Sequence, residues 1–198
     1  MPNKSPTIVR KTAPEATDPR VQRSVHALGV ALVELMQERE FGSITVQQIL
    51  DRAGVGRATF YSHYRNKHDV LYSSYERLFA MLERALDASP TRATRIAPAT
   101  EFIQHIGDSA GVADALRASG QLEAMWSFAT DCFARMIERR IEPAPGVPVS
   151  LTARMLAGAF LEMVKWWHEH PGAATPAQVD AAFHDMARRV LQPARGTR

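Results

Sequence analysis

Two short helical patterns separated by a tight turn, over residues 45–63, constrain the fold more than any other segment of the chain. Thr45, with Gln48 three positions later, forms a capping box that predicts the start of the first helix. Gly54 supplies, without steric cost, the left-handed backbone conformation that a sharp turn requires. A second short helix is expected over residues 57–63. Two helices joined so closely are held at a fixed angle, and this arrangement is typical of a helix-turn-helix.

The second of these helices is expected to have one buried and one free side. Phe60 and Tyr64 lie one turn apart, so both should pack into the core. In helix-turn-helix proteins the second helix enters the major groove of DNA, where its N-terminal residues meet the base edges. The side chains left to face DNA are Arg57, Ala58, Thr59, Tyr61, Ser62 and His63.

The chemistry of this region suits DNA. Arg57 can donate two parallel hydrogen bonds to a guanine edge, or bind a phosphate. Thr59 and Tyr61 can each donate a hydroxyl hydrogen bond to phosphate. Gln47 can reach a base or a phosphate from the first helix, and Lys67 brings positive charge to a phosphate at the start of the next helix. The pattern therefore predicts double-stranded DNA as a partner.

The charge distribution agrees with that prediction. Residues 1–67 contain ten Lys and Arg against six Asp and Glu, whereas the remaining residues contain fourteen against fifteen. A basic end is expected of a nucleic-acid-binding protein, although random scatter also produces an imbalance of this size. A plain helical bundle with a tight turn is the alternative interpretation. The capping box, the turn, the aromatic and hydroxyl residues and the trailing lysine together favour DNA binding over it.

The rest of the chain shows helical periodicity and no alternation typical of strands. The sequence therefore predicts an all-α fold with nine helices, over about residues 19–39, 45–53, 57–63, 67–87, 98–107, 110–118, 121–141, 150–168 and 176–191. Helix caps are expected at Asp18, Asn66 and Ser150, and Gly42 is expected to end the first helix.

Composition limits the class of protein. At 198 residues the chain can bury a core of its own, and its single cysteine, Cys132, excludes an intramolecular disulfide and fits a reducing compartment. Because neither a signal-peptide pattern nor an apolar run of about 18 residues is evident, a cytoplasmic location is expected. We divide the chain into a disordered basic tail over residues 1–18, a DNA-binding domain over 19–66, and a ligand-binding and dimerisation domain over 67–198.

A longer block around the turn carries a resemblance to a known family. The block reads Phe41-Gly42-x-Ile44-Thr45-Val46-x-x-Ile49-x-x-x-Ala53-Gly54-Val55-x-x-x-Thr59-Phe60-Tyr61-x-His63-Tyr64-x-x-Lys67. It resembles the N-terminal DNA-binding domain of TetR/AcrR-type transcriptional regulators, over about residues 20–70. The resemblance implies a homodimeric repressor with a helical ligand-binding domain, released from a palindromic operator by a small molecule. Positions that match the family's DNA contacts are Thr45, Gln47, Arg57, Thr59, Tyr61, His63 and Lys67. Gly56 departs from the family, which often has Ser or Thr there.

The last two predicted helices have long apolar sides. They could complete the core of one chain, or pair with those of a twin in a four-helix bundle. The resemblance favours the dimer, and so does the spacing of about 34–36 Å between two recognition helices on DNA. The helix over 150–168 also has apolar residues at Leu151 and Met155. The interface is expected to contain Leu156, Phe160, Met163, Trp167, Val179, Phe183 and Met186.

Aromatic and sulfur-containing residues of the C-terminal region form a candidate cavity for a small, apolar or aromatic effector. Such a stripe at helical spacing can equally be plain core, but ligand pockets are mostly apolar with few polar groups, and His105 would be such a group. The residues expected to line it are Tyr75, Phe79, Phe102, His105, Trp126, Phe128, Cys132, Phe133 and Met136. The helix over 67–87 would join this cavity to the DNA-binding domain, so a ligand that favours one tilt of the helix would alter the recognition-helix spacing.

The sequence contains no catalytic motif, and neither an enzyme activity nor a cofactor is expected. His168, Glu169 and His170, with His184, could ligate a metal, but alternating residues on a helix face apart, so we expect a solvated helix end. The apolar neighbours of Cys132 should raise its thiol pKa and reduce its reactivity. A DNA-binding architectural protein that responds to no ligand is the second interpretation of the chain.

Overall fold

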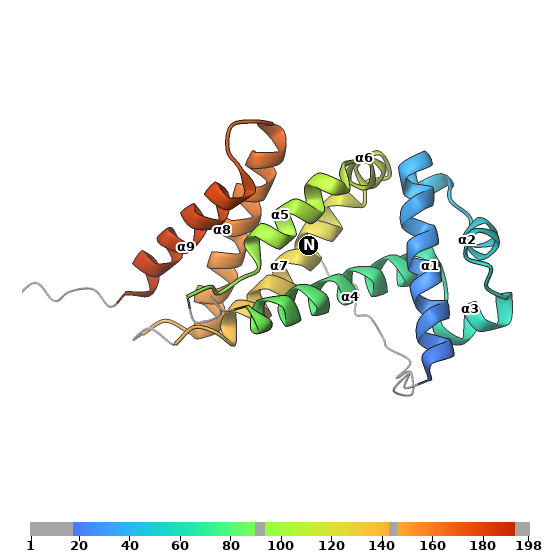
Figure 1. The fold of residues 1–198 in the computed structure, drawn as a ribbon, viewed down its shortest axis with the longest axis horizontal. Helices are drawn as coiled ribbons and strands as arrows, with labels where there is room; N and C mark the ends of the chain where they lie inside the picture. Colours follow the sequence, from blue (N-terminus) through green and yellow to red (C-terminus); the bar gives the residue numbers. More distant parts are fainter. Residues whose placement is uncertain (1–17, 90–93, 143–145, 193–198) are drawn as a thin grey trace, which may run out of the picture.

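A computed structural model describes residues 18–89, 94–142 and 146–192, which are predominantly helical (Figure 1). The described residues contain nine α-helices, one short 3-10 helix and no strand, which confirms the predicted all-α class. The predicted tail lies outside the described residues, except for Asp18. The elements are α1 (Pro19–Glu38), η1 (Phe41–Ser43), α2 (Val46–Ala53), α3 (Arg57–His63), α4 (Lys67–Ala88), α5 (Ala99–Asp108), α6 (Ala110–Ala118), α7 (Leu122–Glu138), α8 (Val149–Glu169) and α9 (Pro176–Leu191).

Helix ends follow the side chains that cap them. Asp18, Thr45 and Asn66 accept hydrogen bonds from the first-turn backbone of α1, α2 and α4, as expected. Two predicted end signals were wrong, although the ends of both helices lie within one residue of those expected. α1 stops before Gly42, which lies in η1, because the neighbouring Phe41 is drawn into the core. Ser150 lies inside the first turn of α8 rather than at its cap, since Pro148 already occupies that position.

The helix α4 joins two hydrophobic cores. One core lies at the end of the molecule that contains α1, α2 and α3, and the other lies among α5, α7, α8 and α9 (Figure 1). The first half of α4 gives Val70 and Leu71 to the former core, and its second half gives Phe79, Leu82 and Leu86 to the latter. Because α4 is buried at both ends, its position depends on both regions.

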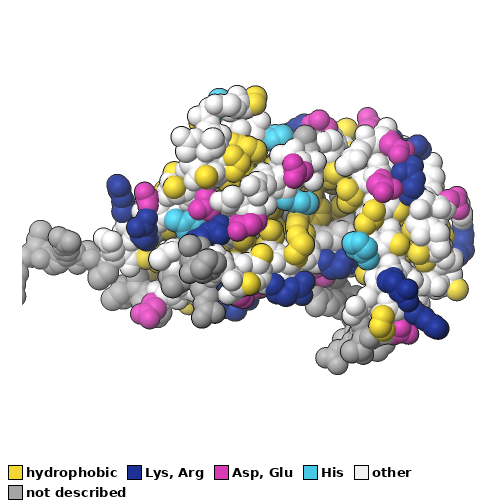
Figure 2. Space-filling model, viewed as in Figure 1, with side chains coloured by type: hydrophobic (Ala, Val, Ile, Leu, Met, Phe, Trp, Pro, Cys, Tyr) yellow, Lys and Arg dark blue, Asp and Glu magenta, His cyan; other side chains and the backbone are white. Residues whose placement is uncertain are grey.

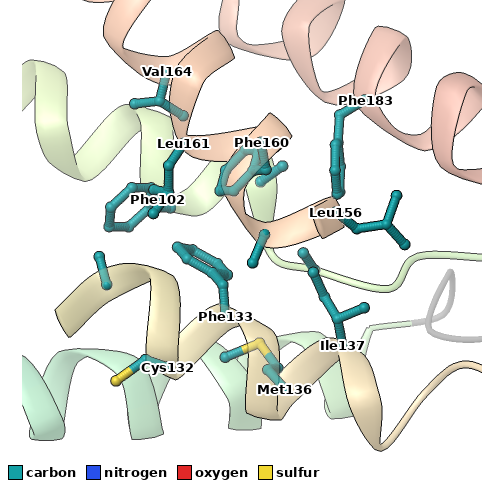
Figure 3. Close-up of a cluster of buried hydrophobic side chains, with 14 of the residues drawn as sticks. Phe102, Cys132, Phe133, Met136, Ile137, Leu156, Phe160, Leu161, Val164 and Phe183 are labelled. Atoms are coloured by element: carbon teal, nitrogen blue, oxygen red, sulfur yellow. The ribbon is translucent and has the colours of Figure 1, made fainter. Parts of the chain in front are cut away.

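Four phenylalanines form the centre of the second core. Phe102, Phe133, Phe160 and Phe183 come from four different helices and point toward one another (Figure 3). The ring centroids of Phe133 and Phe160 are 4.8 Å apart, and those of Phe160 and Phe183 are 5.0 Å apart. The first pair is edge-to-face and the second is tilted, and aromatic pairs at such distances stabilise a core beyond the area they bury.

This packing corrects the predicted dimer interface. Leu156, Phe160, Val179 and Phe183 are buried within one chain, because α8 packs on α7 and α9 packs on α5 and α8. Met163 and Trp167 are half-buried against the same core, and the indole of Trp167 donates to the Ala174 carbonyl at 2.8 Å. Of the predicted interface residues, Met186 is exposed.

Asp180 of α9 fixes the start of α5. Its carboxylate accepts hydrogen bonds from the Arg95 guanidinium at 3.0 Å and from the Thr100 backbone N–H at 3.1 Å. Burial alone would raise the pKa of Asp180, but His184 and Arg95 outweigh burial and lower it to about 2. A depressed carboxyl pKa stabilises the fold above the ordinary pKa, and that contribution is lost as the pH falls toward 2.

Replacing Asp180 by asparagine is expected to lower the free energy of unfolding at pH 7 by about 2 to 3 kcal/mol, because a buried guanidinium loses one carboxylate partner. The difference from the parent protein should shrink as the pH falls below 4. Urea denaturation at several pH values measures both effects. The matched control is Asp185→Asn on the exposed side of α9, which should change stability by less than about 0.5 kcal/mol. Equal losses from both variants would contradict the assigned role.

Candidate nucleic-acid interface and effector cavity

The turn between α2 and α3 has the geometry of a helix-turn-helix. Thr45 and Gln48 complete the predicted capping box at the start of α2. Gly54 ends α2 in the left-handed region with φ 63°, where a side chain would be strained. The Val55 N–H returns to the Leu50 carbonyl at 3.2 Å, which closes the turn. The sequence pattern therefore located both helices and the turn between them correctly.

The recognition helix α3 presents one side to the core and the other to solvent. Phe60 is fully buried and Tyr64 is 6% exposed, as predicted. Of the six α3 residues expected to face DNA, Arg57, Ala58, Tyr61 and Ser62 are exposed, and Thr59 and His63 are half-exposed. Gly56 occupies the N-cap and provides no side-chain hydrogen bond. The free backbone N–H groups of this first turn remain available to a phosphate.

Three polar side chains connect the two helices across the turn. Arg57 donates from Nη2 to Gln47 Oε1 at 2.7 Å, and Gln47 donates from Nε2 to Asp51 Oδ1 at 2.7 Å. This chain holds the guanidinium of Arg57 beside α2, at the N-terminal end of the recognition helix. Both Arg57 and Gln47, the two side chains best suited to base edges, therefore lie next to each other on the exposed surface.

Lys67 does not have the role predicted for it. Its ammonium donates to the carbonyls of Phe41, Gly42 and Ile44 at 2.7, 2.8 and 2.7 Å, and it lies 4.8 Å from the centroid of the Phe41 ring. Burial lowers the pKa of Lys67. Because an ammonium has three protons to donate, all of its hydrogen bonds are committed to the η1 segment. Lys67 is therefore a clamp between the start of α4 and η1 rather than a phosphate ligand.

A cavity of about 480 Å³ lies between the DNA-binding end and the C-terminal helices. Figure 2 shows hydrophobic side chains in the hollow on this face of the molecule. Residues of α1, α4, α5, α6, α7 and α8 line it. Its size is within the usual range for small-molecule sites. A cavity is therefore present in this region, but it lies closer to α1 and α6 than the sequence indicated.

The cavity has only part of the lining that was predicted. Tyr75, Phe102, His105 and Trp126 line it. The predicted residues outside the lining are Phe79, Phe128, Cys132, Phe133 and Met136. Four of those five are buried in the second core, and Phe128 packs against Tyr72 with ring centroids 5.5 Å apart. Burial raises the pKa of the Cys132 thiol to about 11, which agrees with the expected low reactivity.

Sequence reasoning missed the charged residues that line the cavity. Lys165, His168 and Glu169 of α8 line it, and so do Arg117 and Glu123 beside the turn between α6 and α7. Lys165, His168 and Glu169 are spaced by three and four positions, which places them on one side of α8. This spacing could have indicated that they share a surface. In the described residues no group of three or more His, Cys, Asp and Glu side chains is gathered to hold a metal ion.

A polar network in α4 joins the cavity to the recognition helix. Arg77 donates to Ser73 Oγ at 2.7 Å, to Ser74 Oγ at 3.0 Å and to the hydroxyl of Tyr64 at 3.4 Å. Ser74 lines the cavity, whereas Tyr64 follows the last residue of α3. The network lies against Gly29 of α1, where an added Cβ would be 2.6 Å from the Arg77 guanidinium. Glycine therefore permits the close approach of α1 to α4.

Comparison with known proteins agrees with this geometry. Residues 30–72 match the family described as bacterial regulatory proteins of the tetR family. This segment therefore resembles the corresponding segment of TetR-family regulators. A relative described as the uncharacterized HTH-type transcriptional regulator YxbF of Bacillus subtilis is 36% identical over 61 residues. That match covers 30% of this chain and 16% of the relative, so the chain spans about a sixth of the relative's length. The matched relative is named a transcriptional regulator, which agrees with the helix-turn-helix geometry of α2 and α3.

Solved structures share the whole fold. The dihydroxyacetone kinase operon activator DhaS has a TM-score of 0.64 at 15% identity, covering 85% of this chain and 96% of its own. NalD of Pseudomonas aeruginosa, described as the secondary repressor of the MexAB-OprM multidrug efflux pump, has a TM-score of 0.57 at 18% identity. The latter match covers 89% of this chain and all of NalD. A TetR regulator of Streptococcus agalactiae has a TM-score of 0.55 at 23% identity, covering 85% of this chain and 95% of its own.

None of the described helices combines the length and the apolar character needed to cross a bilayer.

Proposed function

We propose that this protein is a regulator of the TetR type, a homodimeric repressor that binds a palindromic operator and is released by a small-molecule effector. The observation that carries the proposal is that α4 takes part in two sites. Its first half both packs into the core of the DNA-binding end and lines the cavity. Because the proposed operator is chromosomal DNA, we also propose that the protein acts in the cytoplasm.

The exposed side of α3 supports the DNA-binding part. Arg57 and Gln47 offer a guanidinium and an amide at the turn, and Thr59 and Tyr61 offer hydroxyl groups further along the helix. The guanidinium suits guanine, and the hydroxyls suit phosphate. We propose further DNA contacts on the same surface from Thr45, Ala58, Ser62 and His63.

The exposed apolar side of α8 and α9 supports the dimer. Leu151 and Met155 of α8 are 59% and 53% exposed, and Trp166 lies further along the same helix. Met186 and Val190 are exposed one turn apart on α9. The two helices pack together, so a twin chain could cover both in a four-helix bundle. These residues replace the buried ones as the proposed interface.

The α4 network supports control by an effector. An effector that contacts Ser74 or Tyr75 would act on the same helix that holds Tyr64 through Arg77. A change in the position of α4 would then move α3, and two sites would influence one element. Equal operator affinity with and without every bound effector would contradict this coupling.

Similar folds accompany both directions of control, since DhaS is named an activator and NalD a repressor. A dimer bound over a promoter excludes the polymerase without any further surface, whereas activation requires an additional contact with the polymerase. We therefore propose repression. Transcription from a promoter that overlaps the operator, measured in vitro with and without the protein, tests the direction.

Selection from a pool of random duplexes tests sequence-specific binding. We expect enrichment of a palindrome whose half-sites are about one helical turn apart, because two recognition helices read successive major grooves. A pool without enrichment would contradict the proposal and favour the alternative of an architectural DNA-binding protein.

Replacing Arg57 by alanine is expected to relax the preference for one base pair in each half-site, at a cost of about 1 to 3 kcal/mol per lost contact. Binding to substituted operators, measured by fluorescence anisotropy, gives the preference at every position. The matched control is Arg139→Ala at the end of α7, which pairs with Glu83 away from α3. A uniform loss of affinity on all operators would instead assign Arg57 to phosphate.

A further inference from the structure

The charges around the cavity balance one another. Lys165 and Glu169 of α8 line it, and so do Arg117 and Glu123 beside the turn between α6 and α7. The contribution from α1 consists of apolar side chains. Lys165 is also held by Glu162 at 3.7 Å, and Arg117 by Asp114 at 2.5 Å. The lining therefore offers neither an excess of positive charge for an anion nor an excess of negative charge for a cation.

The polar groups that α4 and α5 bring to the cavity are uncharged near neutral pH. Burial raises the pKa of Tyr75 to about 12, so its phenol remains protonated. Burial lowers the pKa of His105 and outweighs the opposing charge of Asp108, so its imidazole is neutral at pH 7. Within the described residues, no side chain or backbone group makes a hydrogen bond to the Tyr75 hydroxyl or the His105 ring. Both groups can therefore donate to and accept from a ligand.

Aromatic surfaces complete this lining. Phe102 of α5 and Trp126 of α7 face the same cavity as Tyr75. The Lys165 ammonium lies over the Trp126 ring, 5.5 Å from its centroid. Flat, polarisable walls of this kind favour a ring system, since aromatic groups gain from stacked and edge-to-face contacts.

We propose that the cavity takes an uncharged aromatic molecule with a hydroxyl or carbonyl group, and that Tyr75 and His105 bind that polar group. The inference rests on the proposed function, because it specifies the effector of the same cavity. A charged head group would have to leave water for a site where Tyr75 and His105 carry no compensating charge and the charged side chains balance one another, and such burial is costly. An uncharged ring with one polar oxygen loses little hydration energy when it enters the cavity, and its oxygen can form hydrogen bonds with both Tyr75 and His105.

Four probes of the same ring system test the proposal by isothermal titration calorimetry at pH 7: 1-naphthol, 1-methylnaphthalene, 1-naphthoate and 1-naphthylmethylammonium. We expect 1-naphthol to bind about fivefold or more tightly than 1-methylnaphthalene, and at least tenfold more tightly than either ion. Tightest binding by the carboxylate or by the ammonium would overturn the proposal. Failure of all four probes to bind would overturn it as well.

Tyr75→Phe separates the hydroxyl from the shape of the site. This variant should weaken 1-naphthol about fivefold or more and leave 1-methylnaphthalene within twofold. The matched control is Tyr72→Phe on the same helix, whose ring packs on Phe128 outside the cavity lining. It should leave both affinities unchanged. Equal weakening of the two probes by Tyr75→Phe would overturn the hydrogen-bond assignment.

Operator binding is measured on the same samples, so that the two proposals fail separately. A protein that binds its operator and is released by a different chemical class retains the proposed function and loses this inference. A protein that binds 1-naphthol with unchanged operator affinity retains the ligand class and loses the proposed release.

Discussion

Replacing Met155 by glutamate is expected to convert the protein into a monomer and to lower its operator affinity by about a hundredfold or more. Met155 is 53% exposed in the middle of the proposed interface of α8 and α9. In a symmetric dimer each chain contributes the same residue to the interface. The variant would therefore bury two unpaired carboxylates in each dimer. Two half-sites bound by separate chains lose the advantage of effective concentration that links the two recognition helices.

Analytical ultracentrifugation measures the first effect, because the chain mass of 22.0 kDa separates a monomer from a dimer. Anisotropy on full and half operators measures the second. Met81→Glu is the matched control, since Met81 is 52% exposed on α4, away from α8 and α9. It should remain dimeric with unchanged operator affinity. A dimer of Met155→Glu with normal affinity would contradict the proposed interface.

The position of Met155 shows where helical periodicity stops being informative. α8 is apolar on two sides, one with Leu156 and Phe160 and the other with Leu151 and Met155. The sequence predicts such a helix and its length, but either side could face the chain's own core. The choice depends on the packing of α7 and α9 against α8, which involves residues far apart in the sequence. The helix was therefore predictable, whereas its interface was not.

The helix-turn-helix was predictable because its signals are local. A capping box needs Thr45 and Gln48 on neighbouring turns, and the turn needs a residue such as Gly54 that adopts a positive φ. The cavity is different, because it forms where α1, α6 and the end of α8 leave space between them. Trp126 and Phe133 lie about two turns apart on the same side of α7, yet Phe133 is buried in the core and Trp126 lines the cavity.

Replacing Lys67 by methionine is expected to lower the free energy of unfolding by about 2 to 4 kcal/mol, because three carbonyl groups lose a charged donor. Methionine keeps most of the aliphatic length against Phe41, so the change isolates the ammonium. Urea denaturation measures the loss. Lys165→Met is the matched control, since Lys165 also lies over an aromatic ring but has an exposed carboxylate as its ion-pair partner. The control should cost less than about 1 kcal/mol.

The salt dependence of operator binding distinguishes the clamp from a phosphate contact. A lysine that neutralises one phosphate contributes about 0.9 to the slope of log affinity against log salt concentration, and its loss would reduce the slope by that amount per chain. Because the Lys67 ammonium is committed to Phe41, Gly42 and Ile44, we expect Lys67→Met to weaken binding at every salt concentration with the slope unchanged. A reduced slope at full stability would restore the phosphate role. With an unchanged slope, Lys67 is the residue that makes the start of α4 and the segment before α2 move together, so that a shift of α4 reaches α3.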